Sequence, residues 1–465
     1  MAGSGTLQYV DTTGSWVTNK DGQVVIMHGV NEVFKTAPYY PSAVGFSDDD
    51  AQFLQDNGFN VVRLGIMWAA VEPQPGVYDD DYLAEINKTI ELLAKHGIYT
   101  QLDTHQDLYG IPMGGNGAPP WATMTDGVSN PYFGFPLNYL LNPAQGVVWD
   151  NFWANREVPE SGMGLQDHYT AMWQHVAAYF SGNTNIMGYE PMNEPWPGSN
   201  WLATLINPTF AGEQVLTPFY NQIANAIRSV DQDTTVYYEP FNPAITTLGQ
   251  TIWGAPVALG KINDEHAALA YHDYCAPGVG DCKSNAAKVA EAHNKYAQEN
   301  GMSAFMNEFG CTSVWQDTAA EKEAANTFFN NWAVWAYSGQ GDITGAAGQE
   351  SIVYNPMLAP TGSNVNWNTL KALADPYAQT ISGTPKSYSF TNGVYTFDYS
   401  TARVDGTGNF AAGSTTTFAV PVLAFDNKGF TATVTGGEVL QQTATSLVVA
   451  SDGAANVTVV ISAAA

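Results

Sequence analysis

Two glutamates in this sequence follow an asparagine at the end of an apolar segment that is typical of a β-strand. Glu194 lies in AsnGluPro and Glu308 lies in AsnGluPheGly. Two carboxyl groups that flank one bond can cleave a glycoside, because one protonates the leaving oxygen while the other attacks the sugar or activates water. Glu190 and Glu239 compete for these roles, but each is more readily interpreted as a structural carboxylate. Glu194 and Glu308 are therefore the leading candidates for catalysis.

The elements that must position these glutamates alternate between strands and helices over the first 380 residues. Eight apolar segments are predicted strands: 24–31, 60–68, 98–105, 186–194, 234–240, 268–274, 303–310 and 333–339. Between several of them apolar residues recur at helical spacing, as in Leu83, Ile86, Ile90 and Leu93. Eight strands that alternate with helices predict a (β/α)8 barrel. Strands four and seven face each other in such a barrel, so Glu194 and Glu308 would flank one cleft.

Polar residues end six of the eight predicted strands. They are His28, Asn31, Arg63, His105, Asp107, Asn193, Glu194, His272, Tyr274 and Glu308. Charge is costly to bury at strand ends inside a barrel unless the groups are paired or take part in chemistry. A structural ion-pair network explains any one of these residues, but it does not explain all of them. The polar strand ends therefore mark the predicted catalytic face.

The last part of the chain has a different pattern. Short alternating segments separated by Gly, Asn and Asp turns, with no helical spacing, predict a small antiparallel β-sandwich. The stretch ThrIleSerGlyThrProLys is typical of a domain boundary. We therefore expect a catalytic barrel over residues 1–380 and a sandwich over 381–465. Residues 382–465 contain no Trp, so a structural or interfacial role is favoured over sugar binding.

The chain is strongly acidic, with 16 Lys and Arg against 44 Asp and Glu and a net charge of −28. Such a surface repels phosphate backbones and excludes nucleic-acid binding by charge. No segment approaches the ~18 apolar residues of a membrane span. Cys275 and Cys282 are separated by a Gly/Pro/Asp turn that suits one local disulfide, which leaves Cys311 over. We expect a secreted monomer whose signal peptide, absent from this chain, has been removed.

Five short motifs follow one another at the predicted strand ends. They are ArgLeuGly on strand two, AsnGluPro on strand four, HisAspTyr on strand six, AsnGluPheGly on strand seven and a Trp on strand eight. In this order they resemble the family 5 glycoside hydrolases, which are retaining (β/α)8 enzymes. The opening HisGlyValAsn…LysThrAlaProTyrTyrPro, the segment ThrHisGlnAspLeuTyr and the β-domain are more narrowly similar to bacterial endoglycoceramidases. Those enzymes release an intact oligosaccharide from the ceramide of glycosphingolipids.

The resemblance implies a role for each residue beside the bond that is cleaved. Glu194 would be the acid/base and Glu308 the nucleophile of a retaining endo-β-glycosidase that needs no cofactor or metal. Asn193 would bind the 2-hydroxyl of the sugar. Arg63 and Tyr274 would keep Glu308 ionised, because a cation and a hydroxyl donor both stabilise a carboxylate. Glu194 must stay protonated near neutral pH, so we expect it in the less hydrated and more carboxylate-crowded surroundings.

The resemblance also implies contacts to the rest of the substrate. His272 would lie beside the acid/base, and Trp335, or Trp332 in its place, would form a platform under the sugar ring. The hydroxyls of the first sugars would be bound by Lys35, His105 and Asp107. Ceramide needs an apolar groove, for which the aromatic-rich loops 106–160 and 195–214 are the available material. Transient contact with a micelle or membrane surface is therefore expected. The same aromatic residues would also serve to pack these loops.

Three other functions are weighed against this one. A β-glucanase or β-glucosidase of the same family would keep the chemistry and act on a non-lipid substrate. A metal-dependent (β/α)8 hydrolase would use His28, His105, Asp107 and His272, although strand one has no HisxHis pair. A binding protein would recognise glycolipid without cleaving it, but it would have no use for both catalytic glutamates.

Overall fold

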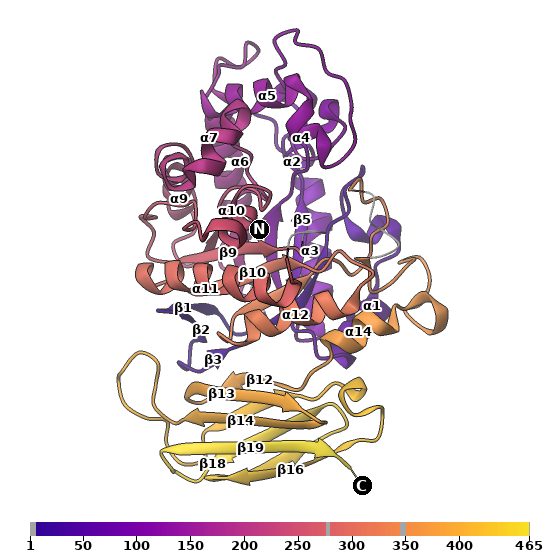
Figure 1. Ribbon diagram of the computed structural model, residues 1–465, viewed down its shortest axis with the longest axis vertical. Helices are drawn as coiled ribbons and strands as arrows, with labels where there is room; N and C mark the ends of the chain where they lie inside the picture. The colour runs from indigo at the N-terminus through magenta and orange to yellow at the C-terminus, as the bar shows by residue number, and fades with distance from the viewer. Residues whose placement is uncertain (1–5, 276–279, 345–349, 465) are drawn as a thin grey trace.

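The computed structural model describes residues 6–275, 280–344 and 350–464 (Figure 1). Its larger part is a closed barrel of eight parallel strands, which confirms the predicted (β/α)8 fold. In chain order the barrel strands are β4 (His28–Glu32), β5 (Val61–Ile66), β6 (Tyr99–Thr104), β7 (Ile186–Glu190), β8 (Val236–Tyr238), β9 (Ala267–Asp273), β10 (Ala304–Phe309) and β11 (Asn331–Val334). Glu308 therefore lies in the seventh strand and Glu194 lies four residues past the end of the fourth, across the barrel.

Helices surround the barrel and cover its strands. They are α1 (Asp48–Asp56), α2 (Trp68–Val71), α3 (Asp80–Lys95), α6 (Leu165–Phe180), α9 (Thr217–Arg228), α10 (Thr246–Trp253), α11 (Cys282–Asn300), α12 (Trp315–Asn326) and α14 (Trp367–Leu373). Helix α3 shows why these segments are helical. The side chain of Asp79 accepts a hydrogen bond from the backbone N–H of Tyr82 and so caps the helix. Leu83, Ile86 and Ile90 recur on one face and are fully buried against the barrel.

Two long connections cover the carboxyl ends of the strands. The connection after β6 holds α4 (Leu137–Leu141) and α5 (Pro143–Trp153), and the one after β7 holds α7 (Trp201–Ile206) and α8 (Pro208–Ala211). Helices α4, α5 and α7 lie at the end of the molecule remote from the C-terminal strands (Figure 1). Trp149 and Trp196 are buried, and the Trp153 indole donates to the Trp196 carbonyl at 2.8 Å. Part of the aromatic content of these loops therefore forms a core of their own.

The C-terminal part is an antiparallel sandwich of two sheets, as predicted. Its strands are β1 (Val10–Thr13), β2 (Trp16–Asn19), β3 (Val24–Val25), β12 (Tyr377–Ile381), β13 (Thr384–Thr391), β14 (Val394–Ser400), β15 (Thr415–Ala419), β16 (Phe430–Thr435), β17 (Gly437–Gln442), β18 (Ser446–Ser451) and β19 (Asn456–Ala463). One sheet has the order β1-β2-β3-β12-β15-β18-β17 and the other β13-β14-β19-β16. The first sheet therefore takes three strands from the start of the chain.

The segment 24–31, expected to be one barrel strand, is divided between the two parts. Residues Val24 and Val25 pair antiparallel with Ile381 and Thr380 of β12, and the barrel strand β4 begins only at His28. Strand β12 begins at Tyr377, a few residues before the boundary expected near residue 380. No turn signal separates β3 from β4 in the sequence. Both strands are buried, so the apolar run continues from one into the other.

His28 and Trp332 lie at the junction between the barrel and the sandwich rather than on the catalytic face. The His28 ring stacks between Trp332, at a centroid distance of 4.2 Å, and Tyr377, at 3.8 Å. Both positions are early in their strands, at the amino ends of β4 and β11, so their side chains are remote from the carboxyl ends. The prediction that His28 ends its strand is therefore wrong, because the strand begins there. Trp332 stacks on His28 and is too far from the carboxyl ends of the strands to form the expected platform in place of Trp335.

Candidate active site

The ends of β7 and β10 bring the two candidate glutamates together. One carboxylate oxygen of Glu194, one of Glu308 and one ring nitrogen of His272 all lie within 4.8 Å of one another. All three side chains are largely withdrawn from solvent. Two carboxyl groups at this spacing can act on the same bond from two sides.

Glu308 accepts two hydrogen bonds, one on each carboxylate oxygen. Arg63 Nη1 donates to one oxygen at 2.5 Å, and the Tyr274 hydroxyl donates to the other at 2.7 Å. Hydrogen bonds to a carboxylate from a cation are stronger than those between neutral groups. Both carboxylate oxygens are thereby fixed in orientation, which is what an attacking group needs.

Arg63 is fully buried and joins Glu308 to the polar interior of the barrel. Its guanidinium contacts Glu190, Glu308, Asp103, Asn31 and Asn193, at distances from 2.5 to 3.2 Å. A buried cation needs such partners, because an unpaired one would carry a large desolvation cost. Glu190 Oε2 also accepts from Asn307 at 2.7 Å. These contacts agree with the interpretation of Glu190 as a structural carboxylate.

Glu194 has a different environment. Asn242 Nδ2 donates to Oε2 at 2.7 Å, and His272 Nδ1 lies 2.8 Å from Oε1. Burial, followed by the negative charge of Asp107, raises the pKa of Glu194 to about 7. Burial also lowers the pKa of His272 to about 3, against the opposing charge of Glu308. Glu194 is thus protonated up to near neutral pH, beside an imidazole that carries no charge.

The backbone of Glu194 adopts the left-handed conformation, with φ of 42°. Its N–H donates to Glu239 Oε2 at 2.7 Å, and Gln106 Nε2 donates to its carbonyl at 2.9 Å. Such a conformation is unfavourable for a residue with a side chain, so these two bonds help to hold it. Glu239 therefore helps to hold the backbone of Glu194, which agrees with its interpretation as a structural carboxylate.

Four predicted sugar-contact residues form one cluster beside the two glutamates. Lys35 Nζ lies 2.8 Å from Asp107 and 2.9 Å from Asp342, and 4.3 Å from the centroid of the Trp335 ring. The His105 ring stacks on Trp335 at a centroid distance of 5.3 Å. Burial lowers the pKa of His105, but two neighbouring carboxylates outweigh it and raise the pKa to about 9. The structure brings these residues together, while their contacts to a sugar stay a prediction.

Several residues of the site were not found in the sequence. Asn242 lies four residues after β8, and Asp342 lies in the segment after β11, where the Trp335 indole donates to it at 3.1 Å. Neither position carries a periodic pattern that would single it out. Asp103 had a visible signal, since it is an acidic residue inside predicted strand three. It lies 2.7 Å from His105 Nδ1 and 3.2 Å from Arg63.

The alternative metal site does not assemble from its four proposed ligands. His28 lies at the junction of the two parts, as described above, and within the described residues it shares no ligand cluster with His105, Asp107 and His272. The clusters of possible ligands are instead Glu194 with His272 and Glu308, Glu190 with Glu239 and His272, and Cys275 with Cys282 and Glu321.

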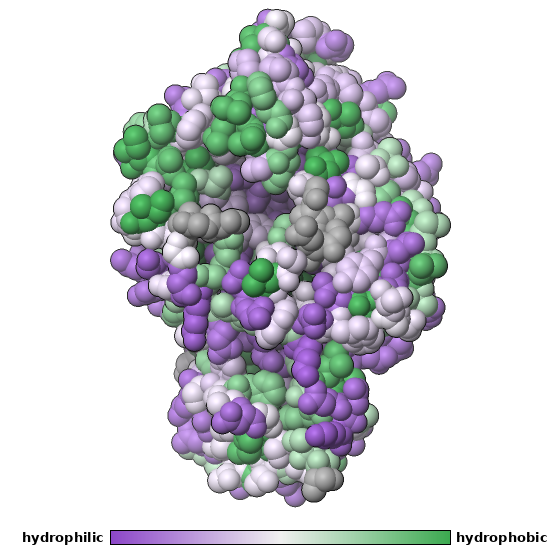
Figure 2. Space-filling model, turned by 45° about the vertical axis from the view of Figure 1, so that its right-hand side comes forward, coloured by the Kyte–Doolittle hydropathy of each residue, from purple (hydrophilic) through white to green (hydrophobic). Residues whose placement is uncertain are grey.

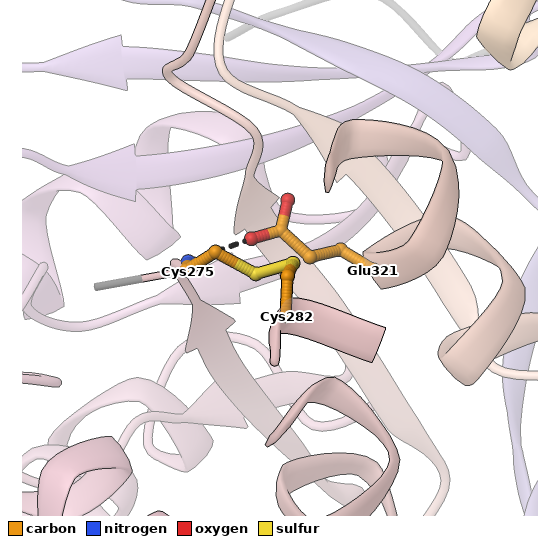
Figure 3. Close-up of side chains that lie close together, drawn as sticks. All are labelled: Cys275, Cys282 and Glu321. Atoms are coloured by element: carbon orange, nitrogen blue, oxygen red, sulfur yellow. Dashed lines mark hydrogen bonds between the residues drawn. A yellow bond between two sulfur atoms is a disulfide. The ribbon is translucent and has the colours of Figure 1, made fainter. Parts of the chain in front are cut away.

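The cysteines have the arrangement that their spacing suggested. Cys275 and Cys282 form a disulfide, with Cα atoms 5.3 Å apart (Figure 3). Cys311 is free, and its thiol donates to Glu350 at 2.9 Å. The disulfide joins the residue that follows Tyr274 to the first residue of α11.

Comparison with known proteins agrees with this geometry. The family model described as Cellulase (glycosyl hydrolase family 5) matches residues 18–341, and the glycoside hydrolase family 5 C-terminal domain matches residues 376–461. Endoglycoceramidase I of Rhodococcus hoagii is 29% identical over 96% of this chain and 87% of its own length. The structures of endo-glycoceramidase II from Rhodococcus sp. as a lactosyl-enzyme intermediate and as a ganglioside GM3 complex are 27% and 26% identical. Each has a TM-score of 0.77 and covers 97% of this chain and 100% of its own. The chain belongs to glycosyl hydrolase family 5.

Proposed function

We propose that this family 5 glycoside hydrolase is an endoglycoceramidase, which hydrolyses the linkage between the oligosaccharide and the ceramide of glycosphingolipids. The observation that carries the proposal is the pair Glu194 and Glu308, with oxygens within 4.8 Å, in a chain that resembles endoglycoceramidases over both of its parts. The glucanase or glucosidase alternative would use the same pair, but no observation favours it.

The reaction follows from the two environments of the carboxyl groups. Glu308, ionised beside Arg63 and Tyr274, attacks the anomeric carbon, while Glu194 transfers its proton to the oxygen that leaves with ceramide. A covalent glycosyl-enzyme forms, and Glu194, now a carboxylate, removes a proton from the water that releases the glycan. Retention is supported by the short separation, since retaining carboxyl groups lie ~5–5.5 Å apart and inverting ones ~6.5–9.5 Å. The lactosyl-enzyme intermediate of the Rhodococcus relative gives further support.

The residues around the pair have complementary roles in this proposal. Asn193, whose side chain also accepts from Arg63 at 2.8 Å, would bind the 2-hydroxyl of the sugar at the cleaved bond. Trp335 would form the platform under a sugar ring, and Lys35, His105 and Asp107 would bind hydroxyls beside it. His272, being neutral, would orient Glu194 without competing for its proton.

An apolar rim near the carboxyl ends of the strands supports a lipid substrate. It is defined here by the exposed side chains on helices α4, α7, α8 and α10, which are Leu137, Leu140, Leu141, Leu202, Ile206, Phe210, Ile252 and Trp253. Ile206 and Phe210 expose 72% and 63% of their surface. Figure 2 shows apolar surface on both sides of a hollow in the upper part of the molecule. Large exposed apolar side chains at a site entrance favour contact with ceramide and with a micelle or membrane surface.

We also propose that the protein is a secreted monomer. The disulfide between Cys275 and Cys282 supports an oxidising compartment. The net charge of −28 favours a soluble particle that repels its own copies. Among the residues that the structure describes, no helix has the length and apolar character needed to cross a bilayer.

Mass spectrometry of the products from a lactosylceramide-based ganglioside tests the proposed function. Release of the whole oligosaccharide together with free ceramide is expected, and Glu308→Ser should abolish it. Free glucose from glucosylceramide alone, or cleavage restricted to plain β-glucans, would contradict the endoglycoceramidase assignment. Either result would leave the two glutamates as the catalytic pair.

A further inference from the structure

We infer that Glu321 is a positioning residue for the nucleophile: its carboxyl group holds the ends of β9 and β10 in register and thereby aligns Tyr274 with Glu308. The inference rests on the proposed hydrolysis at Glu308. Glu321 lies on α12, outside the barrel, and touches neither catalytic glutamate in the contacts described above. Its effect would pass through the backbone of the two strands that carry Tyr274 and Glu308.

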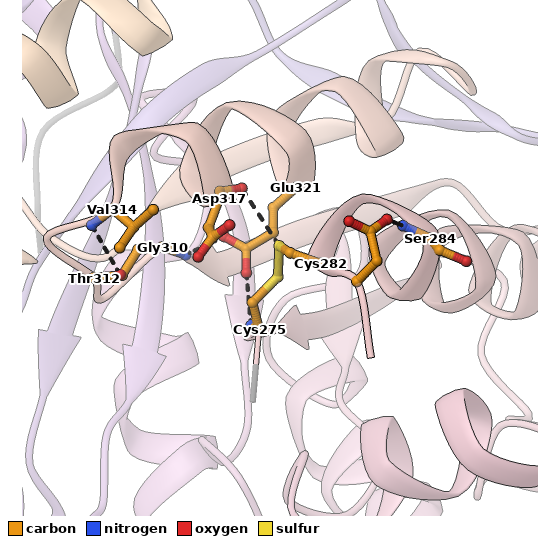
Figure 4. The surroundings of a disulfide bond; sticks show 9 residues. Cys275, Cys282, Ser284, Gly310, Thr312, Val314, Asp317 and Glu321 are labelled. Atoms are coloured by element: carbon orange, nitrogen blue, oxygen red, sulfur yellow. Dashed lines mark hydrogen bonds between the residues drawn. A yellow bond between two sulfur atoms is a disulfide. The ribbon is translucent and has the colours of Figure 1, made fainter. Parts of the chain in front are cut away.

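The contacts of Glu321 are directed at two backbone N–H groups. Oε1 accepts from the N–H of Cys275 at 2.8 Å, and Oε2 accepts from the N–H of Gly310 at 2.9 Å. Figure 3 shows the bond to Cys275, and Gly310 lies close to the same side chain in Figure 4. The two oxygens of one carboxyl group have a fixed separation, so accepting both bonds sets the spacing of the two N–H groups.

The two N–H groups are close in sequence to the reacting residues. Cys275 follows Tyr274 directly, and Gly310 comes two residues after Glu308, just past the end of β10. Backbone groups beyond the end of a strand lose their ladder partners and need another acceptor when they are buried. Glu321 supplies it for both strands at once. The bond that depends on their relative position is the 2.7 Å hydrogen bond from the Tyr274 hydroxyl to Glu308.

A buried carboxyl group at this place has a cost that its two contacts help to offset. Glu321 is fully buried, and burial followed by the charge of Asp273 raises its pKa well above the usual range, against the opposing effect of the two N–H groups. Asp317 on the same helix adds to the repulsion. An apolar residue would avoid this cost but would leave two buried donors unpaired.

The disulfide restrains the same strand end from the other side. Cys275 is joined to Cys282, the first residue of α11, and α11 packs on α12. Figure 4 shows Glu321 and the disulfide on neighbouring elements around the end of β9. The residue after Tyr274 is thus fixed both by a covalent link to α11 and by a hydrogen bond to α12.

The test compares Glu321→Gln with a matched change on the same helix. An amide has a single acceptor oxygen, so Gln keeps one of the two bonds and places an NH2 group against the other N–H. The control is Lys322→Met, which removes the buried contacts of Lys322 to Asp375 and to the Ala372 carbonyl and leaves the strand ends untouched. Activity is measured on an activated aryl β-lactoside, which requires no lipid, in single turnovers over a range of substrate concentrations, and thermal midpoints are recorded for both variants.

The expected result concerns the glycosylation step, in which Glu308 attacks the sugar. The Tyr274 hydroxyl, directly after β9, fixes the orientation of one Glu308 oxygen at 2.7 Å. A misaligned Tyr274 orients the attacking carboxylate less well, so Glu321→Gln should lower the single-turnover rate of glycosylation about tenfold and leave the KM unchanged. Lys322→Met should leave this rate in place even where it lowers the thermal midpoint.

A double-mutant cycle separates positioning from a general loss of structure. If Glu321 acts through Tyr274, then Glu321→Gln should lower the glycosylation rate much less in a Tyr274→Phe background. An equal loss in both backgrounds, or an unchanged rate in Glu321→Gln, would overturn the inference. If Glu321→Gln does not fold, the variant Cys275→Ser with Cys282→Ser releases the same strand end, and an unchanged glycosylation rate there would overturn it as well. A complete lack of β-glycosidase activity in the unsubstituted protein would instead refute the proposed function, and the inference with it.

Discussion

The hydrogen bond from Asn242 to Glu194 should set the upper pH limit of activity. Asn242 Oδ1 accepts from the backbone N–H of Ala244 at 2.9 Å, so its NH2 group is the part that faces Glu194, at 2.7 Å. That donor stabilises the ionised form of Glu194 and so opposes the effect of burial on the pKa. The substitution Asn242→Leu, which is similar in size, removes the donor and should raise the pKa of Glu194.

The size of the shift follows from the bond that is lost. A hydrogen bond to a charged group contributes ~1.5–3 kcal/mol, and one pKa unit corresponds to about 1.36 kcal/mol. The full loss would therefore be about one to two units, and we expect the lower value because His272 still contacts the other oxygen. Glu194 acts as an acid only when it is protonated, so activity falls as the pH rises through its pKa. Raising that pKa from about 7 to about 8 extends activity to higher pH.

The assay is the pH dependence of kcat/KM on an aryl β-lactoside, because its two limbs report the free enzyme. Asn242→Asp should move the basic limb in the same direction, since it places a second carboxylate beside Glu194 and keeps the acceptor for Ala244. Tyr274→Phe is the matched control, because its hydroxyl contacts Glu308 and not Glu194, so it should leave the basic limb in place. A basic limb that stays in place or moves downward in Asn242→Leu would refute the reasoning that Glu194 titrates there under the control of Asn242.

Three further predictions concern Glu194, the buried cation Arg63 and the apolar rim. Glu194→Ala should slow cleavage of a ganglioside by ~10²–10⁴-fold but spare the first step on an aryl glycoside with a good leaving group, as a burst measurement would show. Arg63→Lys should lower the free energy of unfolding in urea by about 3 kcal/mol or more, because a point charge cannot satisfy all the partners of the guanidinium; an unchanged urea midpoint would contradict this. Ile206→Ser with Phe210→Ser should reduce turnover of glycolipid in vesicles at least tenfold, since each side chain contributes ~1.5–3 kcal/mol when buried, and should leave the soluble aryl substrate unaffected; equal losses on both substrates would argue against lipid contact.

The barrel and the proximity of its two candidate glutamates could be predicted because their signals are local. Each strand is a short apolar run. A polar residue at the end of such a run predicts the catalytic face, regardless of the residues that precede it. Glu194 and Glu308 were found from the order of the strands, because the fourth and seventh strands are three places apart and so face each other across an eight-stranded barrel. No contact between distant residues had to be guessed for this step.

The supporting residues could not be predicted, because their roles depend on where loops turn. Asn242 reaches Glu194 from a loop 48 residues later in the chain, and Asp342 meets Lys35 from beyond the eighth strand. Neither loop has a period that fixes which side chain faces inward. The division of segment 24–31 was missed for a related reason. A buried apolar run has the same residue pattern whether it pairs with barrel strands or with a sandwich strand.

The pairing of β3 with β12 means that the two parts of this chain are not separable modules. Val24 of β3 pairs with Ile381 of β12, so the sheet that contains the first three strands of the chain is completed only by strands of its C-terminal part. During synthesis, β1 to β3 leave the ribosome long before β12, so the edge of β3 stays unpaired until β12 has been made. Such distant pairing is slow to form and cooperative once formed. A barrel produced without the sandwich would therefore expose both an unpaired edge of β3 and the apolar lower surface around His28 and Trp332, and aggregation of that fragment is the expected consequence.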